Sequence, residues 1–418
     1  MLRNLRDVIK LTFYEKLFLL FPIVLILRPL VINVFLILIT FILIYEFYKK
    51  KYLYIFKQEI WISFFLLFIF YSISRGFFST DVPLAVKSSV SLVRFLAFSL
   101  FIYLCIPNAK NLNIIIKFWT ILLILLCIDT LIQYFFFKDI FGFTKLGIWR
   151  LTGPFDRPVI GAYLAYISIP IISYFFFKYK NFNFNNKILL FLICFFLFVT
   201  IGLTGERLSF IMFFSSLIVI LFFNFRIKNF IYLLIIVFCI LLFMYLFFLP
   251  FNDRIHQLYS TIIAFPDSPW GRLYHSSYLV FKNNFFFGAG LKNYSIVCDN
   301  QIIDPLKGLE NIPQFCSTHP HHLYLEILSE SGILGFLLLM LTFGIFFTSI
   351  VKKIKKLKNN KVYKEYKGFL YGNILILLIY FWPIKTSGRF FTTWNGSFFW
   401  FNLGIALLIT KEFYKKNK

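Results

Sequence analysis

The sequence His319-Pro320-His321-His322 is the part of the chain best suited to proton transfer. Proline is favoured at the first position of a helix and an apolar segment follows the motif, so we expect His319 to cap a helix and His321 to lie in its first turn. The positive end of the helix dipole disfavours the imidazolium form. A histidine that stays neutral near pH 7 can accept a proton, so His321 is a candidate general base for a hydroxyl group.

The same histidines could instead hold a metal ion. Imidazole and carboxylate groups are common metal ligands, and Glu326 follows His322 by one helical turn. The sequence has no HExxH motif, no CxxC motif and no cluster of aspartates. We therefore expect no metal and no other cofactor.

A second candidate site is Thr204-Gly205-Glu206-Arg207, which lies between two apolar segments. Thr204 is suited to cap the following helix, with Arg207 in its first turn. Free backbone N–H groups, the helix dipole and a guanidinium would then meet, and all three attract an anion. The alternative is a capped helix whose arginine extends to the membrane interface without a ligand.

Arginine is the common cation outside the segments that we expect in the cytoplasm. These arginines are Arg28, Arg75, Arg94, Arg150, Arg157, Arg207, Arg254, Arg272 and Arg389. Lysine suffices to orient a membrane protein, whereas the planar guanidinium binds phosphate or carboxylate through two hydrogen bonds. We expect the arginines to hold an anionic ligand; the alternative is that they pair with Asp156, Glu206 and Asp253. Arg94 lies in an apolar segment, where it could pair with Asp129 or reach a lipid phosphate.

A membrane domain must position these residues. With 60% hydrophobic residues among 418 and a mean hydropathy of +0.80, the chain has more apolar surface than one soluble core can bury. Apolar runs of about 20 residues, enough to cross the hydrocarbon layer, recur along it. The sequence predicts an all-α polytopic membrane protein with about twelve transmembrane helices. Their expected ranges are Leu11 to Leu27, Leu30 to Tyr48, Glu59 to Phe78, Pro83 to Cys105, Leu112 to Phe136, Val159 to Phe177, Ile188 to Leu203, Arg207 to Phe223, Phe230 to Leu249, His321 to Ile350, Phe369 to Pro383 and Ser397 to Ile409.

The net charge of +25 fits membrane topology rather than a nucleic-acid partner. Lysine runs such as residues 352–367 fall between apolar segments, and the positive-inside rule places them and both termini in the cytoplasm. The basic N-terminus has no small-residue cleavage site, so we expect a retained first helix. Residues 137–158, and one long polar segment at 250–320 between the ninth and tenth helices, would face the periplasm. The segment after His321 is too long for one crossing, so we expect the part before Gly332 to lie in the membrane interface.

Cysteine usage agrees with this topology. Cys298 and Cys316 are the two cysteines in the long segment, which we place in an oxidising compartment, so we predict a disulfide between them. The alternative is a pair of free thiols. The other cysteines are scattered singly through apolar segments, where they are best interpreted as small core residues.

Several motifs resemble those of the O-antigen ligases and Wzy-type polymerases, which share a polysaccharide-polymerase membrane domain. His321-His322, followed by Gly332 and Gly335, is similar to the histidine motif of that family. Further similarities are Arg150-Leu151-Thr152-Gly153-Pro154-Phe155, Thr204-Gly205-Glu206-Arg207, and Gly271-Arg272 followed by Gly288-Ala289-Gly290-Leu291-Lys292-Asn293-Tyr294. They suggest two regions: N-terminal transmembrane helices at residues 1–136 and a catalytic membrane region at 137–418.

One position departs from the family pattern. Where the family has an amide or hydroxyl after its histidine, this chain has His322, so which of the two imidazoles accepts a proton stays open. Glu326 lies four residues after His322 and could orient it. The spacing to the two glycines selects His321.

The resemblance implies an inverting, metal-independent glycosyltransferase in the bacterial inner membrane. It would move an O-antigen-type glycan from undecaprenyl pyrophosphate to a hydroxyl of the lipid A core, at the periplasmic face. Arg207 corresponds to the family's essential arginine and Arg272 to a second one, and His321 would deprotonate the acceptor. Further candidates for binding the pyrophosphate are Arg94, Arg150, Arg157 and Arg254.

Two other functions are compatible with this sequence. A Wzy-type polymerase would use the same donor to extend another lipid-linked glycan, and these motifs do not separate it from a ligase. A polysaccharide or lipid transporter would place its polar sites near the bilayer midplane, in broken helices and inverted repeats. The polar groups here gather at one predicted face, which favours the enzyme.

Overall fold

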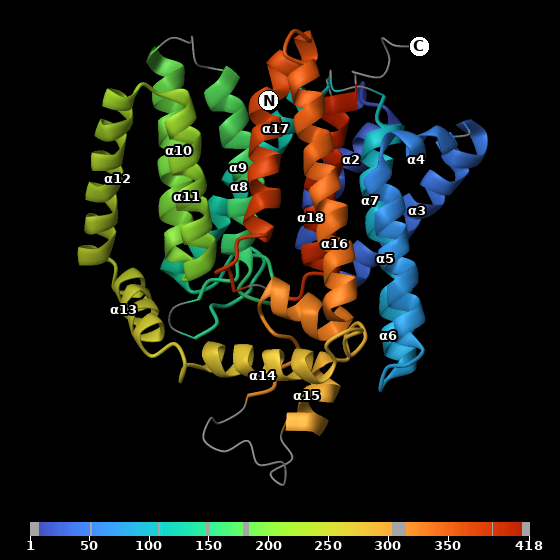
Figure 1. Cartoon of the computed structure of the whole chain (residues 1–418). Coiled ribbons are helices and arrows are strands. Elements are labelled where there is room, and N and C mark those ends of the chain that lie inside the picture. Colours follow the sequence, from blue (N-terminus) through green and yellow to red (C-terminus); the bar gives the residue numbers. More distant parts are fainter. Residues whose placement is uncertain are drawn as a thin grey trace. The chain divides into compact units, whose positions relative to one another are not determined.

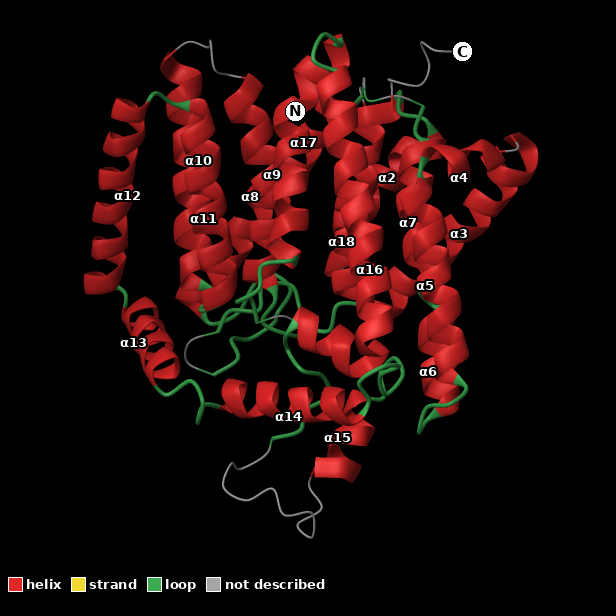
Figure 2. Ribbon diagram, viewed as in Figure 1, coloured by secondary structure: helices red, strands yellow, loops and turns green. Residues whose placement is uncertain are grey.

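The computed structural model describes residues 8–411, apart from residues 51, 108, 110, 148–149, 179–183, 303–314 and 387. In this part of the chain the regular structure is helical (Figure 2). Both chain ends, which we expect in the cytoplasm, lie outside the described residues, as does part of the long segment 250–320.

The chain packs into two compact units, each built from three segments. The first unit comprises residues 1–28, 106–262 and 359–379, and the second comprises residues 29–105, 263–358 and 380–418. The division at residue 136, between N-terminal helices and a catalytic region, concerns function rather than packing and remains a prediction.

The helices divide between the units as follows, with α13 and α17 each ending one residue into the second. The first unit contains α2 (Phe13–Ile26), α8 (Leu112–Phe136), α9 (Ile160–Lys178), α10 (Phe184–Leu203), α11 (Arg207–Asn224), α12 (Ile227–Phe247), α13 (Leu249–Ile263) and α17 (Lys361–Tyr380). The second contains α3 (Pro29–Lys50), η1 (Tyr52–Tyr54), α4 (Ile55–Gln58), α5 (Ile60–Gly76), α6 (Val82–Val90), α7 (Val93–Cys105), α14 (Pro269–Asn283), α15 (Tyr294–Ile302), α16 (Leu323–Lys356) and α18 (Thr393–Thr410).

The protein is a multi-pass membrane protein, but the described residues do not confirm the expected count of twelve spans. Seven helices among the described residues are long and apolar enough to cross a bilayer, or eight if the pair Tyr52–Gln58 and Ile60–Gly76, bent by 94°, is one span. Each of the twelve predicted segments does overlap a helix. Some of these helices are short: α2 has 14 residues, and at 1.5 Å per residue it covers about 21 Å of a hydrocarbon layer of about 30 Å.

In the first unit, buried polar side chains fix the segment that carries Arg150. Gln133, on α8, accepts hydrogen bonds from the backbone N–H groups of Thr152 and Gly153, both at 2.9 Å. Its amide nitrogen also donates to the Thr152 hydroxyl at 2.8 Å. One residue earlier, Leu151 N donates to Thr204 O at 3.2 Å. Arg150 is therefore held beside the Thr204-Gly205-Glu206-Arg207 turn.

In the second unit, α16 kinks at Gly332, where φ is 64° and ψ is −174°. The loop after α14 pairs with the backbone at this kink: Ile333 N donates to Phe285 O, and Ala289 N donates to Ser329 O, both at 2.8 Å. A Cβ on Gly332 would lie 2.4 Å from Phe286 O, so the kink requires glycine at this position. In Figure 1, α14 runs across the end of α16 that precedes the kink.

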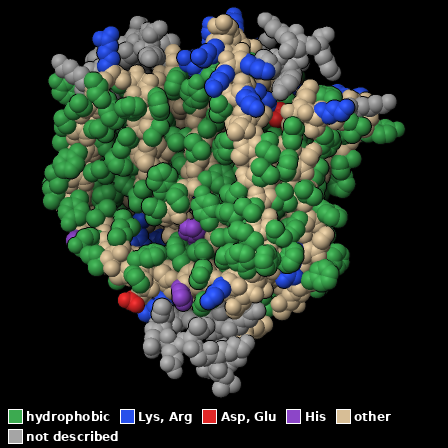
Figure 3. Space-filling view, viewed as in Figure 1, with side chains coloured by type: hydrophobic (Ala, Val, Ile, Leu, Met, Phe, Trp, Pro, Cys, Tyr) green, Lys and Arg blue, Asp and Glu red, His purple; other side chains and the backbone are tan. Residues whose placement is uncertain are grey.

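The surface reflects a lipid environment. Hydrophobic side chains cover most of the face shown in Figure 3, and lysine and arginine side chains gather where α16 ends. That end carries Lys353, Lys355 and Lys356 in its last turn. The basic run at residues 352–367 therefore begins at the end of an apolar helix, which is where the positive-inside rule expects such runs.

Candidate functional site

In the first unit, Glu206 connects the starts of α9 and α11. It occupies the N-cap position of α11, where Thr204 was expected. Its carboxylate accepts hydrogen bonds from Gly161 N at 2.7 Å and Ala162 N at 3.2 Å, at the start of α9, and from the Ser209 hydroxyl at 2.9 Å. Thr204 instead donates its hydroxyl to Ile201 O at 2.7 Å. The expected cap is wrong because the tight Gly205 turn, with φ at 73°, shifts the helix start by two residues.

The Glu206 carboxyl is difficult to ionise. Burial raises its pKa to about 7, and the hydrogen bonds from Gly161, Ser209 and Ala162 together with the charge of Arg150 oppose that rise. Within the described part of the chain Glu206 forms no ion pair, so the suggested pairing with an arginine is not observed.

Three arginines from different segments of the first unit come together. The pKa of the Arg254 guanidinium, on α13, is lowered by burial and then by the positive charges of Arg150 and Arg207, while Asp253 opposes the shift. Arg207 Nη1 and Arg254 Nε are buried without a hydrogen-bond partner among the described residues. Like charges repel and buried donors need acceptors, so this group is suited to bind an anion.

Two other arginines of this unit are placed differently. Arg157 is exposed, in the loop before α9. Arg28 lies 3.9 Å from Asp156, and both side chains of that pair are more than half exposed. An exposed ion pair contributes little.

In the second unit, His322 is used as a structural residue. It is the N-cap of α16, a place that we expected for His319, and its Nδ1 accepts from Leu325 N at 3.3 Å. Its Nε2 lies 2.7 Å from Pro383 O. A carbonyl oxygen can only accept, so this nitrogen carries the proton and donates the hydrogen bond. Burial lowers the pKa of His322, and the contact with Pro383 opposes that shift. The neutral ring therefore has both nitrogens engaged.

His321 presents its ring differently. Its backbone adopts a left-handed conformation with φ at 54°. The ring lies against that of His319, with centroids 3.8 Å apart and the planes tilted by 39°, and makes a T-shaped contact with Trp270 at 5.1 Å. Trp270 lies in the first turn of α14, two residues before Arg272. A buried Nε on Arg272 has no hydrogen-bond partner in the described part of the chain.

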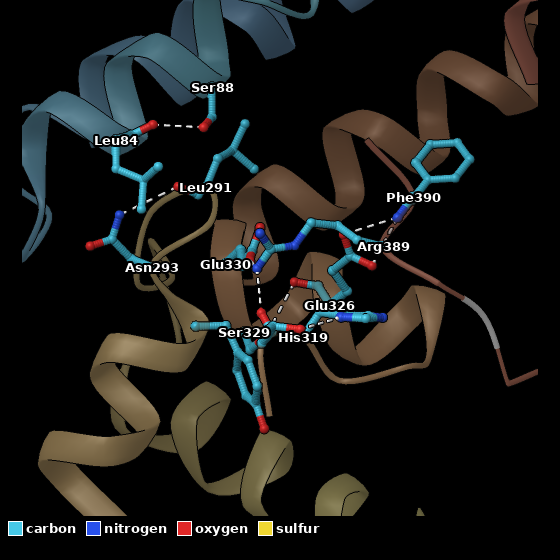
Figure 4. Close-up of polar contacts among 12 residues, drawn as sticks. Leu84, Ser88, Leu291, Asn293, His319, Glu326, Ser329, Glu330, Arg389 and Phe390 are labelled. Carbon is cyan, nitrogen blue, oxygen red and sulfur yellow. Dashed lines mark hydrogen bonds and ion pairs between the residues drawn. The ribbon is translucent and has the colours of Figure 1, made fainter. Parts of the chain in front are cut away.

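Glu326 does not orient His322. Its two carboxylate oxygens accept from Phe390 N, both at 3.1 Å, because the connection between α17 and α18 folds over the start of α16. The same connection supplies Arg389, whose Nη2 donates to Thr318 O at 2.7 Å and pairs with Glu330 at 3.1 Å. Figure 4 shows the Arg389 and Glu330 side chains facing each other, with Glu326 and His319 nearby.

Arg94 also belongs to the second unit. Its Nη2 donates to the Thr393 hydroxyl at 3.4 Å, and its Nε is buried without a partner among the described residues. Asp129, in the first unit, accepts from Ile140 N at 2.9 Å, and among the described residues neither Arg94 nor Asp129 forms an ion pair.

A disulfide joins Cys298 and Cys316, whose Cα atoms are 5.9 Å apart. Cys298 lies in a small core with Leu273 and Val280 of α14, so the bridge ties the chain before the histidines to that helix. Among the described residues no group of three or more His, Cys, Asp or Glu side chains is arranged to hold a metal ion.

Sequence reasoning missed three residues that support these sites. The Gln133 side chain accepts from the backbone of Thr152, the backbone N–H of Phe390 donates to Glu326, and Lys292 lies in the Gly288-to-Tyr294 motif without having been assigned a role. A glutamine within an otherwise apolar run was a detectable signal for the first. Every residue except proline has a backbone N–H, so residue type could not point to that of Phe390.

Residues 192–340 match the family model of the O-antigen ligases. The chain carries an O-antigen ligase domain. The match runs from within α10 into α16 and includes the Glu206-Arg207 turn, Arg254, Arg272 and His321. Arg94, Arg150 and the connection that carries Arg389 lie outside it. A search of curated proteins found no match to the sequence. The match to the O-antigen ligases, over about a third of the chain, and the apolar helices together support a membrane protein related to glycan ligases and polymerases.

Proposed function

We propose that this protein transfers an O-antigen-type glycan from undecaprenyl pyrophosphate to a hydroxyl of the lipid A core, at the periplasmic face of the bacterial inner membrane. The observation that carries the proposal is the group of Arg150, Arg207 and Arg254, with its buried donor nitrogens. A pyrophosphate supplies the negative charge and the acceptor oxygens that such a group needs. The O-antigen ligase domain supports the glycan part of the proposal.

The chemistry follows from the two kinds of residue. His321 removes the proton of the acceptor hydroxyl, and the oxygen attacks the anomeric carbon of the donor from the side opposite the pyrophosphate. The bond from that carbon to the pyrophosphate oxygen breaks, and its electron pair leaves with the pyrophosphate. Arginine side chains stabilise the charge that develops there. Inversion at the anomeric carbon follows, and no step needs a metal.

His321 rather than His322 is the base in this proposal. Nδ1 of His322 already accepts a hydrogen bond and Nε2 already donates one, so that ring has no free lone pair. The proposal assigns Arg272, on the helix that also carries Trp270, to the pyrophosphate as a further guanidinium. Arg157, which is exposed, remains a weaker candidate for the same role.

Deleting the gene and analysing the lipopolysaccharide tests the reaction. The proposal expects lipid A core without long glycan chains, while polymer remains on the carrier lipid. A single repeat attached to the core would indicate a polymerase instead. Unchanged lipopolysaccharide and unchanged carrier-linked glycan would contradict both enzymes.

A further inference from the structure

A second group of cations surrounds the N-terminus of α18, in the unit that contains His321. Arg94 on α7, Lys292 in the loop after α14 and Arg389 before α18 supply it. None of the three belongs to the arginine group of the first unit. The question is whether local partners account for their charges.

Lys292 is held in place by its neighbours along the backbone. Gly290 N donates to Glu330 O at 2.8 Å, which fixes the loop against α16. Asp81 N donates to the Asn293 side chain at 2.7 Å, which fixes the other end of the loop to the start of α6. Lys292 itself has a φ of 63°, an uncommon value for a residue with a side chain. The loop therefore presents this lysine beside Glu330 in a defined conformation.

Arg389, just before α18, and Arg94, on α7, both lie at the start of α18. The carbonyl oxygen of Arg389 accepts from the Thr392 hydroxyl at 3.1 Å and from the Asn395 amide at 3.0 Å, so its backbone is fixed at the helix start. Its side chain pairs with Glu330 at 3.1 Å. Arg94 reaches the next residue, Thr393, at 3.4 Å. Lys292 and Arg389 therefore both lie beside Glu330, and Arg389 and Arg94 both lie at the start of α18.

Positive charge at this place exceeds negative charge. Glu330 is paired with Arg389, Glu326 accepts from Phe390 N, and Asp81 caps α6 by accepting from Leu84 N at 2.9 Å. In the described part of the chain neither Arg94 nor Lys292 forms an ion pair.

The protonation of Lys292 reflects the same excess. Burial lowers its pKa, the charges of Arg389, Arg94 and Lys87 lower it further, and Glu330 opposes them. An anion placed here would relieve the repulsion among these cations and accept from the buried Arg94 Nε.

We propose that Arg94 and Lys292, beside the N-terminus of α18, bind a phosphate group of the acceptor glycan. The assignment to the acceptor rests on the proposed function, in which His321 meets the acceptor and other arginines hold the pyrophosphate of the donor. Arg389 links the proposed anion site to the histidine turn. Its guanidinium pairs with Glu330 and also donates to Thr318 O, three residues before His321. The site would hold the acceptor through an anionic group away from the reacting hydroxyl.

Binding of two forms of one acceptor tests the site directly. The probes are lipid A core as isolated, with its phosphates, and the same glycolipid after phosphatase treatment. Their affinities are measured for the full-length protein in phosphatidylcholine nanodiscs. Wild type should bind the phosphorylated form at least about tenfold more tightly, the usual effect of one charge-assisted hydrogen bond. Equal affinity of wild type for both forms would overturn the inference, whatever the variants do.

Variants locate the effect. Lys292→Met and Arg94→Gln should each weaken binding of the phosphorylated acceptor by about tenfold and leave the dephosphorylated form unchanged, and Lys292→Arg should restore most of the loss. The matched control is Lys282→Met, at an exposed lysine in the last turn of α14, which should alter neither affinity. An equal loss for both acceptors in Lys292→Met would indicate a structural role and overturn the inference.

A third arm separates a lipid headgroup from the acceptor. Nanodiscs that contain phosphatidylglycerol should leave the phosphate preference intact, and loss of the preference in wild type would assign the site to the headgroup and overturn the inference. Glycan transfer is followed in the same samples. Preferential binding without any transfer would contradict the proposed function and leave the anion site standing, whereas transfer without a phosphate preference would do the reverse.

Discussion

At the scale of single residues, Arg207 is distinguished by what its guanidinium lacks. Its Nη1 is buried with no partner among the described residues, and two arginines lie close by. Arg207→Lys keeps the charge but removes the planar fork, so we expect glycan transfer to fall by roughly 10- to 100-fold. The assay is transfer in membranes with matched protein levels. Arg226→Lys, at an exposed arginine before α12, is the control and should be fully active; equal activity of both variants would contradict the role of Arg207.

The two adjacent histidines should respond differently to substitution. His321→Ala should lower turnover by roughly 10²–10⁴-fold, the usual share of general acid–base catalysis, with donor binding nearly intact. His322→Asn should stay active, because asparagine can accept the hydrogen bond from Leu325 N at the helix cap. Turnover and donor binding are measured separately. Full activity in His321→Ala together with inactivity in His322→Asn would move the base to His322.

Glu206 should make stability depend on pH. Its folded-state pKa of about 7 lies above its ordinary value of 4.5, so the folded protein binds more protons than the unfolded chain between these values. The free energy of unfolding should therefore fall as pH rises through this window and level off above it. Glu206→Gln should match the thermal midpoint of wild type near pH 5 and exceed it near pH 8. A variant that is less stable than wild type at pH 8 would show that the charged carboxylate is needed.

At the scale of elements, the kink in α16 separates the histidine-bearing turn from the apolar part of the helix. Gly332→Ala would force a Cβ to within 2.4 Å of Phe286 O at a φ of 64°, so we expect a loss of several degrees in the thermal midpoint. Gly344→Ala lies in the same helix, where an added Cβ meets nothing within 4 Å, and it should be neutral or stabilising. Fluorescence-detected size-exclusion chromatography after heating compares the two. Equal midpoints would mean that the kink can relax.

At the scale of the whole molecule, the part of α16 after Gly332 should determine on which sides of the membrane its flanking segments lie. From Ile333 to Lys356 it is about 36 Å long, enough for one crossing. Single cysteines at Asp267 and Asn359, in a variant without the four unpaired cysteines, should therefore differ in labelling by an impermeant thiol reagent in intact cells. Only position 267 should react. Labelling of both would contradict the topology and the periplasmic location of the chemistry.

Local pattern was sufficient to predict where the helices lie and to select candidates for the chemistry. The apolar run of α8 gave its bounds, Leu112 to Phe136, because a long apolar segment in lipid must satisfy its own backbone hydrogen bonds as a helix. The roles of Arg207 and His321 as candidates came from residue type and spacing. Span number did not follow from the same pattern, because helices such as α2 are apolar but too short to cross.

Tertiary structure decided which polar groups remain available, and contacts between distant residues are the reason. Capping moved from His319 to His322 because Pro383, 61 residues away, accepts from the His322 ring. Glu326 does not orient the histidine, because its carboxylate accepts a hydrogen bond from Phe390 N, 64 residues away. A sequence lists donors and acceptors, but each buried group takes the partner that the fold brings within about 3 Å, and only those left without one can serve a ligand.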